Sequence, residues 1–257
     1  MKQLFAILTI CSILCSIYSC SSNSAKAEKS VNQTIEQEVK QPIKKSKFLV
    51  HIINPKEQNL RLYWKTANGN RYGSFKNLKD SLAKADETLV FAMNAGMFKK
   101  DYSPLGLYIE NGRTITKLNK VKKAYGNFYL QPNGVFYLTN DNESTICKTT
   151  NFKNNNNIKY ATQSGPMLVI DGKLHPKFNK KSTSTHYRNG VGILPNGNLI
   201  FVMSNEKVNF YTFAMFFKEK GCENALYLDG FVSKTYLPEK GANDLGGDFG
   251  VIVGEVE

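Results

Sequence analysis

The sequence contains little of what a metal centre or a disulfide scaffold requires. Its three histidines, His51, His175 and His186, lie far apart in the chain, and no histidine or cysteine has the spacing of a zinc site. Of five cysteines, only Cys147 and Cys222 lie beyond residue 20. The sequence does not show whether their Cα atoms approach to disulfide distance. We therefore predict no cofactor and leave a metal requirement open.

The chain also lacks an apolar run long enough to cross a bilayer at its start. Residues 4–17 are apolar but too few for a membrane-spanning helix, and they follow Lys2. The run closes in Ile17, Tyr18 and Ser19, directly before Cys20. A charged start, an apolar middle and small residues before a cleavage point are typical of a secretory signal, and the ending resembles the lipobox of bacterial lipoproteins. We expect residues 1–19 to be a lipoprotein signal peptide. The alternative is an ordinary signal peptide with an incidental cysteine.

The next segment lacks aromatic side chains. Residues 21–46 are rich in Ser, Lys, Glu, Gln and Asn, and such a composition buries too little apolar surface to fold. We expect residues 20–46 to be the lipidated Cys20 and a disordered tether, and residues 47–257 to be the folded domain. The expected localisation is an exported bacterial lipoprotein, anchored to the membrane on its periplasmic or cell-surface side.

Acidic residues are in deficit: 34 Lys and Arg against 21 Asp and Glu give a formal net charge of +13. This charge makes anionic partners plausible. The Lys-rich stretches at residues 40–47, 117–123 and 177–181 are separated, however, and no nucleic-acid-binding motif accompanies them. We predict no nucleic-acid partner, and a membrane contact only through the lipid anchor.

The most informative stretch is residues 225–233, Ala-Leu-Tyr-Leu-Asp-Gly-Phe-Val-Ser. An apolar run ending in Asp229-Gly230 predicts a buried strand that presents Asp229 at its end. The preceding residues 208–221 have apolar side chains on one face and end in a glycine, which predicts a helix. The alternative is that Asp229-Gly230 forms only a turn.

The same order of helix, apolar strand and polar residue near a glycine recurs earlier in the chain. Residues 75–85 predict a helix and residues 88–93 a strand, which runs directly into Asn94-Ala95-Gly96. We expect Asn94 to lie beside Asp229 at one end of a sheet. Turns favour both Asn and Gly, so the Asn-Ala-Gly motif alone is weak evidence. The prediction rests on the repeated helix, strand and turn arrangement.

Several short strands flank two-residue turns, a pattern that predicts hairpins. They span residues 105–115, 128–138, 167–174 and 191–202. We interpret Asp171-Gly172 as one of these turns rather than as a catalytic site. The pattern predicts a single α+β domain of mixed, largely antiparallel sheets with a few packed helices.

Two further segments do not follow this turn chemistry. Residues 161–166 bring Gln163, Ser164 and Gly165 together before a strand, where a glycine lets the backbone approach a ligand and N–H groups form an anion-binding concavity. Residues 182–190 place Arg188 at the entrance to the next strand. Arginine grips phosphate bidentately, although a lone arginine is more often a surface or salt-bridging residue.

Four motifs in this order resemble the phosphodiester glycosidase family, and specifically its uncharacterised bacterial branch. They are residues 94–98 (Asn-Ala-Gly-Met-Phe), 163–169 (Gln-Ser-Gly-Pro-Met-Leu-Val), 188–192 (Arg-Asn-Gly-Val-Gly) and 224–233, which includes Asp229. The animal members have an Asn-Gly-Gly turn in place of residues 94–96 and a run of glycines after the Asp. These departures leave the sugar identity open.

The resemblance implies hydrolysis of a sugar-1-phosphodiester, with release of a free sugar and a phosphomonoester. By this reading Asp229 is the acid/base or nucleophile, and Glu206 is a second carboxylate that completes a pair. Arg188 holds the phosphate, helped by backbone N–H groups near Ser164 and Gly165. The remaining substrate-binding candidates are Asn94, Gly96, Gln163 and Ser233.

Each assignment has a structural alternative. Glu206 is more often an exposed charge at a helix start, and Asn94 and Gln163 are able to cap backbone groups instead of binding a ligand. At the level of function, the alternatives are a non-catalytic lipoprotein that binds an anionic glycan and a scaffold with a degenerate site. The catalytic reading requires Asn94, Gln163, Arg188 and Asp229 to converge on one hollow.

Overall fold

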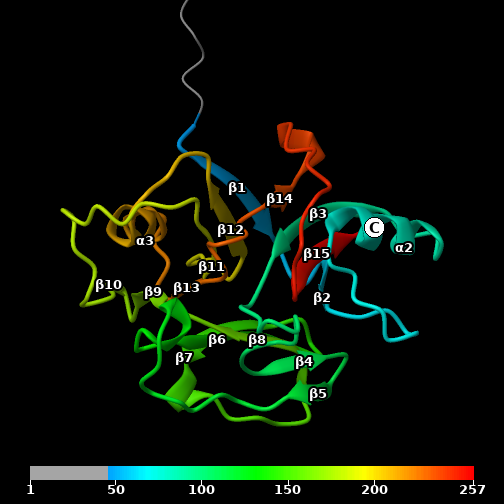
Figure 1. The fold of residues 1–257 in the computed structure, drawn as a ribbon, viewed down its shortest axis with the longest axis horizontal. Helices are drawn as coiled ribbons and strands as arrows, with labels where there is room; N and C mark the ends of the chain where they lie inside the picture. The colour runs from blue at the N-terminus through cyan, green and yellow to red at the C-terminus, as the bar shows by residue number, and fades with distance from the viewer. Residues whose placement is uncertain (1–45) are drawn as a thin grey trace, which may run out of the picture. The chain divides into compact units, whose positions relative to one another are not determined.

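Three antiparallel sheets and two α-helices make up the part of the chain that the computed structural model describes, residues 46–257 (Figure 1). The predicted signal peptide, the predicted lipidation site Cys20 and almost all of the predicted tether lie outside these residues. Within residues 46–257 no helix is long and apolar enough to cross a membrane. Cys147 and Cys222 are both free thiols.

The first sheet has six strands and the second has four. In spatial order, the first contains β1 (Phe48–Ile53), β12 (Leu199–Ser204), β11 (Asn189–Ile193), β13 (Ala225–Tyr227), β9 (Met167–Ile170) and β10 (Lys173–Leu174). The second contains β14 (Thr235–Tyr236), β3 (Leu89–Asn94), β15 (Ile252–Val256) and β2 (Asn59–Tyr63). Strands β13 and β14 are joined by the segment that includes Asp229, so the chain passes from one sheet to the other there.

The third sheet, green in Figure 1, lies below the other two in that view. Its strands in spatial order are β5 (Arg113–Thr116), β4 (Tyr108–Glu110), β8 (Ile158–Ser164), β6 (Gly134–Thr139) and β7 (Ser144–Lys148). Short 3-10 helices follow or precede its strands, η1 (Asn127–Tyr129) and η2 (Thr149–Asn151), and a third, η3 (Pro238–Lys240), follows β14.

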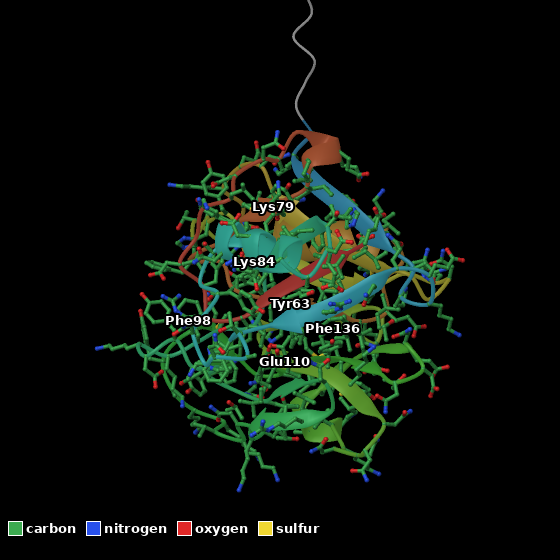
Figure 2. The ribbon with its side chains drawn as sticks, turned by 90° about the vertical axis from the view of Figure 1, so that its right-hand side faces the viewer. Tyr63, Lys79, Lys84, Phe98, Glu110 and Phe136 are labelled. Atoms are coloured by element: carbon green, nitrogen blue, oxygen red, sulfur yellow. The ribbon has the colours of Figure 1, made fainter. Side chains whose placement is uncertain are left out.

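Both predicted helices are present and amphipathic. Helix α2 (Phe75–Ala83) begins after Ser74, whose side chain accepts from the Asn77 N–H, and it buries Leu78 and Leu82. Figure 2 shows Lys79 and Lys84 on its outer side. Helix α3 (Phe210–Glu219) is shorter than the predicted 208–221, because Asn209 caps it through the Thr212 N–H.

The three sheets share one core. Phe91 of β3, Phe201 of β12 and Phe136 of β6 come from the three different sheets, and all three are buried. The ring centroids of Phe91 and Phe201 are 5.2 Å apart, and those of Phe136 and Phe201 are 6.2 Å apart. Figure 2 labels Phe136 at the boundary between the green sheet and the strands above it. Aromatic contacts therefore hold the sheets together at their common centre.

Three of the four predicted hairpins are confirmed, and the one at residues 128–138 is wrong. Strand β6 pairs with β7 and β8, while the residues before it form η1 and a loop. The reason is local: the Asn133 side chain donates to the Phe128 carbonyl at 2.9 Å, which closes residues 128–133 into a loop instead of a strand that pairs with β6.

Replacing Glu255 with alanine is expected to lower the free energy of unfolding by about 3 kcal/mol. The buried Glu255 carboxylate lies 2.6 Å from His51 Nε2 and accepts from Gln58 Nε2 at 2.5 Å. Burial disfavours its ionisation, but these hydrogen bonds outweigh burial and set the pKa of Glu255 below its ordinary value. This stabilisation is fully present above the ordinary pKa of 4.5 and is lost in acid. Urea titration at neutral pH measures the change, and Glu255→Gln, which keeps one acceptor, should lose less.

Candidate functional site

A network of buried amides lies where the first and second sheets meet. Strand β3 ends at Asn94, strand β11 begins at Asn189, and Asp229 follows β13. Asn189 Nδ2 donates to the carbonyl oxygen of Asn94 at 2.7 Å and to its Oδ1 at 3.0 Å. Asn94 Nδ2 donates to the Asp229 carbonyl at 2.7 Å, and Asn189 Oδ1 accepts from the Asp229 N–H at 3.0 Å. Asn94 thus lies beside Asp229, as the sequence predicts.

The turn that begins at Asp229 is fixed from both ends. Asp229 Oδ1 accepts from the Phe231 N–H at 3.2 Å, and Ser233 Oγ donates to the Asp229 carbonyl at 3.1 Å. Gly230 lies directly against the Tyr227 hydroxyl, since a Cβ at this position would come within 1.5 Å of that oxygen. Only glycine therefore allows the turn to pack this closely.

The Asp229 carboxyl is the titratable group of this turn. Its side chain is partly exposed, yet most of its surroundings are protein, and this burial raises its pKa to about 6. The hydrogen bond from Phe231 opposes the shift without cancelling it. A carboxyl with this pKa changes charge near neutral pH, as a general acid or base requires.

A hollow of about 450 Å³ adjoins the turn. Its wall includes residues 230–234, and two cationic side chains, Lys207 and Lys234, line it together with His186. Lys234 pairs with Asp244, whereas Lys207 forms no ion pair within residues 46–257. The hollow therefore presents positive charge, which suits an anionic ligand.

Aromatic side chains and one further carboxylate complete the wall. Phe231 is 98% exposed and Tyr187 is also exposed, so both present ring faces beside the hollow. Asp248 contributes the carboxylate. It accepts from the Tyr102 hydroxyl and pairs with Arg71 at 2.8 Å, and these two partners hold its pKa below the ordinary value. The two carboxyls near the hollow, Asp229 and Asp248, therefore have pKa values shifted in opposite directions.

Arg188 differs from its predicted role. Its guanidinium is 1% exposed, stacks on Phe210 at 3.6 Å, and donates through Nε to the Val208 carbonyl at 2.8 Å. It also donates to the Tyr227 hydroxyl at 3.4 Å. Because these donors are used internally, the structure does not present Arg188 to a phosphate in the hollow. The Tyr227 hydroxyl that accepts from Arg188 also lies against Gly230, the residue after Asp229, so Arg188 and the Asp229 turn lie on the same side of the molecule.

Glu206 lies outside the hollow. Its carboxylate is exposed and forms an ion pair with Lys47 at 2.8 Å, and it precedes helix α3 without reaching the wall described above. The structure thus favours the surface-charge alternative for Glu206. The carboxylate that lines the hollow instead is Asp248.

The segment at Gln163 faces a different part of the protein. Gln163 Oε1 accepts from the Leu107 and Asn119 N–H groups, and Gln163 Nε2 donates to the Asn119 carbonyl. Ser164 Oγ donates to the Leu228 carbonyl, next to Asp229. Gln163 therefore holds a loop of the third sheet. Asn94 lies beside Asp229, but none of the four residues Asn94, Gln163, Arg188 and Asp229 is among those that line the hollow, so the expected convergence on one hollow is not found.

The two predicted glycines are packing positions. A Cβ at Gly96 would lie 2.1 Å from Thr162 Oγ1, and one at Gly165 would lie 2.6 Å from Asn133 Cβ. Both glycines thus allow segments of the protein to approach one another. Of the six predicted substrate-binding residues, only Ser233 lines the hollow.

Within residues 46–257, no group of three or more His, Cys, Asp or Glu side chains is placed to hold a metal ion. Sequence reasoning missed Asn189, Lys207 and Asp248. Asn189 directly follows Arg188 in the 188–192 motif, and nothing local distinguishes it from the first residue of a strand. Asp248 lies in the glycine-rich residues 246–250, a composition that signals a turn, and nothing local distinguishes it from one.

Comparisons with known proteins identify the family. The sequence profile of the phosphodiester glycosidase family matches residues 87–249, more than half of the chain. The chain belongs to the phosphodiester glycosidase family. It is also 39% identical over 188 residues to the uncharacterised protein YigE of Escherichia coli strain K12, and the match covers 73% of each chain.

Solved structures share the phosphodiester glycosidase fold of this chain. The catalytic domain of zebrafish N-acetylglucosamine-1-phosphodiester alpha-N-acetylglucosaminidase, auto-inhibited by its pro-peptide, matches with a TM-score of 0.55 and 13% identity, covering 83% of this chain and 84% of that one. A hypothetical protein from Synechocystis matches with a TM-score of 0.50 and 16% identity, covering 81% of this chain and 59% of the other. At these identities the likeness shows the fold, here an α+β arrangement of largely antiparallel sheets.

Proposed function

We propose that this protein is a hydrolase that cleaves a sugar-1-phosphodiester of an exported glycan and releases a free sugar and a phosphomonoester. Membership of the phosphodiester glycosidase family supports the class of reaction. The observation that carries the proposal is the Asp229 turn: a carboxyl whose pKa is raised to about 6 begins a turn, and the following residues 230–234 line a hollow together with Lys207. A carboxylate beside positive charge suits a substrate that joins a sugar carbon to a phosphate.

The phosphate and the sugar of such a substrate need different groups from the protein. Phosphate leaves well from the anomeric carbon and needs little proton donation, so the main task is to stabilise its negative charge. Lys207 supplies positive charge at the hollow. The exposed rings of Phe231 and Tyr187 offer apolar faces against which the C–H face of a sugar packs.

We propose that attack occurs at carbon rather than at phosphorus. A carboxylate and an anionic phosphoryl group repel each other, which disfavours attack at phosphorus. The same carboxylate stabilises the oxocarbenium-like positive charge that develops at the anomeric carbon. Asp229 then acts as the carboxylate facing that carbon, as nucleophile or as the base that activates water. Hydrolysis in oxygen-18 water tests this step: label in the sugar supports carbon attack, and label in the phosphate rejects it.

The activity itself is tested with the purified protein and a panel of sugar-1-phosphodiesters, led by the methyl diester of N-acetylglucosamine-1-phosphate. We expect release of free sugar that requires Asp229 and increases as the pH rises through about 6, because the carboxylate form is the active one. Saturable binding of every diester without release of sugar from any of them would reject the hydrolase and favour the glycan-binding alternative.

The exported location rests on the sequence of the first 20 residues, which resembles a lipoprotein signal ending at Cys20. We propose that the protein is anchored to a bacterial membrane through this cysteine and acts on a surface or periplasmic glycan. Partition of the full-length protein into the detergent phase supports the anchor, and full recovery in the aqueous phase rejects it.

A further inference from the structure

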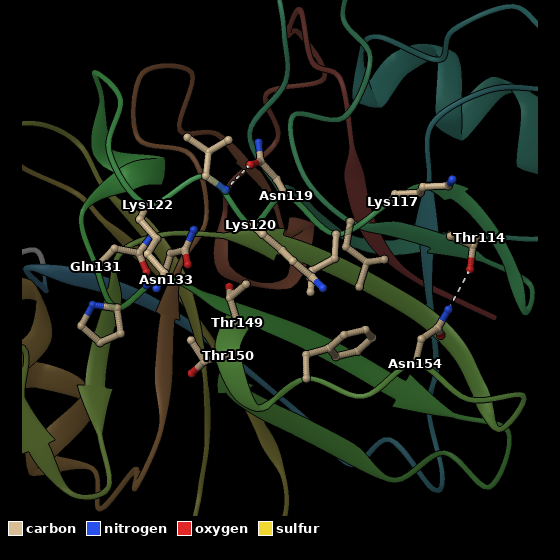
Figure 3. A pocket seen from close by; sticks show the side chains of 15 residues that line it. Thr114, Lys117, Asn119, Lys120, Lys122, Gln131, Asn133, Thr149, Thr150 and Asn154 are labelled. Carbon is tan, nitrogen blue, oxygen red and sulfur yellow. Dashed lines mark hydrogen bonds between the residues drawn. The ribbon is translucent and has the colours of Figure 1, made fainter.

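A second and larger hollow, of about 830 Å³, lies on the third sheet (Figure 3). It is lined by Leu107 and by three segments of chain: residues 114–122 in and after β5, residues 131–133 before β6, and residues 149–154 after β7. We call it the lysine pocket. It shares no lining residue with the hollow beside Asp229. Its volume lies within the range of about 300–1,000 Å³ that is usual for small-molecule sites.

The charge of the lysine pocket has one sign. Lys117, Lys120 and Lys122 line it, and no Asp or Glu does. None of the three lysines forms an ion pair within residues 46–257. In Figure 3, Lys120 extends across the middle of the pocket, Lys122 lies toward Gln131, and Lys117 lies toward the opposite end. Positive charge is therefore distributed along the pocket, which favours an elongated ligand with more than one negative group.

Between the lysines the wall is mixed in a way that suits a sugar. Phe152 and Leu118 provide apolar surface, while Thr150, Gln131 and Asn154 provide hydroxyl and amide groups. Sugar rings have apolar C–H faces and a rim of hydroxyls, so a wall that combines an aromatic ring with convergent hydrogen-bonding groups complements them.

Asn133 gives an independent indication of a ligand. Its side chain lines the lysine pocket, yet the residue is only 1% exposed. Nδ2 donates to the Phe128 carbonyl, but Oδ1 has no hydrogen-bond partner in the described chain. A buried acceptor without a donor costs about 1–3 kcal/mol. A hydroxyl or amide N–H of a ligand is the kind of donor that this oxygen lacks.

The lysine-bearing segment is held in place rather than free. Gln163 clamps Asn119, between Lys117 and Lys120, by accepting from its N–H at 2.9 Å and donating to its carbonyl at 2.8 Å. Gln163 Nε2 also donates to Thr149 Oγ1 on the opposite wall. A buried side chain thus fixes two walls of the lysine pocket to each other, so that the site is built before any ligand binds.

From these observations we infer that the lysine pocket binds an anionic oligosaccharide at a site separate from the Asp229 hollow. The inference does not depend on the proposed hydrolysis, because it concerns binding to a different wall. Neighbouring residues of β8 join the two regions, since Gln163 supports the lysine pocket and Ser164 contacts Leu228, the residue before Asp229.

Calorimetric titration tests the inference with a ligand that is not a phosphodiester. A hyaluronan tetrasaccharide carries carboxylates on alternate sugars, and chitotetraose is a neutral chain of the same length. We expect the first to bind with a Kd of about 1 mM or tighter, and the second to bind at least about tenfold more weakly. No saturable binding of the acidic tetrasaccharide overturns the inference, and so does equal binding of the neutral one or of inorganic phosphate.

Variants locate the binding. Joint replacement of Lys117, Lys120 and Lys122 by alanine should weaken binding at least about tenfold. The matched control replaces three exposed lysines elsewhere, Lys177, Lys180 and Lys181, which changes the net charge equally and should leave affinity within about twofold. Equal losses in both triple variants would mean general attraction to a basic surface and overturn the site. Phe152→Ala, which changes no charge, should weaken binding by about threefold, and unchanged affinity places the ligand outside the pocket.

Discussion

Replacing Asp229 with asparagine is expected to stabilise the protein at pH 7. Burial raises the pKa of the Asp229 carboxyl from 3.8 to about 6, so the folded state holds a proton that the unfolded chain has already lost. Folded stability therefore falls as the pH rises from about 4 to about 6, and it stays lower above that range. A shift of about two units at about 1.4 kcal/mol each corresponds to about 3 kcal/mol. Asparagine avoids this loss and keeps an oxygen for the Phe231 N–H.

The same substitution is expected to lower sugar release by about a thousandfold or more, because an amide neither accepts a proton nor attacks carbon at neutral pH. Urea titrations at pH 4 and pH 7.5 measure the first effect, and sugar release measures the second. Greater stability together with lost activity indicates a residue retained for chemistry at the expense of the fold. A variant that is no more stable at pH 7.5 than the wild type contradicts the raised pKa.

Asp171→Asn is the matched control, because Asp171 also precedes a glycine in a turn. Its φ is +49°, a conformation that asparagine also adopts, and its carboxylate lies at the surface, 2.8 Å from Lys148 Nζ. Stability should change by no more than about 0.5 kcal/mol, and activity should be unaffected. A loss of activity in this variant means that the assay responds to surface charge rather than to the Asp229 site.

The convergence of Asn94 and Asp229 was predictable from sequence because it follows from strand ends. An apolar run that stops at a polar residue marks where a strand leaves the core, and two such stops place their side chains at a sheet edge. Helix α2, helix α3 and three of the hairpins follow from equally local patterns. Which strands pair within each of the three sheets does not follow from any such local pattern, since the pairing joins segments far apart in the chain.

The roles of Arg188 and Gln163 were not predictable for a related reason. Sequence shows which groups a side chain carries but not whether they are already used. The Val208 and Ser184 carbonyls accept from Arg188, and both walls of the lysine pocket engage Gln163. Both residues lie near strand ends. At such positions a single sequence shows the same pattern for a side chain that binds a ligand and for one that supports the fold.

Asn189 is the opposite case. Its sequence context does not mark it as functional, but the structure places it at the centre of the buried amide network. Replacing it with alanine is expected to lower the free energy of unfolding by about 3 kcal/mol or more and to lower sugar release by about a hundredfold. The side chain is fully buried and makes three hydrogen bonds, two donated to Asn94 and one accepted from the Asp229 N–H. Alanine leaves the buried Asn94 carbonyl and the Asp229 N–H without their partners.

Comparison with Glu255→Ala distinguishes the effect of Asn189→Ala on stability from its effect on sugar release. Both substitutions remove buried hydrogen bonds and should cost similar stability, but Glu255 pairs with Phe91 across the sheet, three residues before the end of β3, whereas Asn189 holds the turn itself. Sugar release is therefore measured at a temperature where urea titration shows both variants to be folded. Activity should fall for Asn189→Ala alone, because only that variant frees the Asp229 backbone to move. Equal activity in the two variants means that the amide network supports the fold without positioning Asp229, and the proposed role of the turn in catalysis then fails.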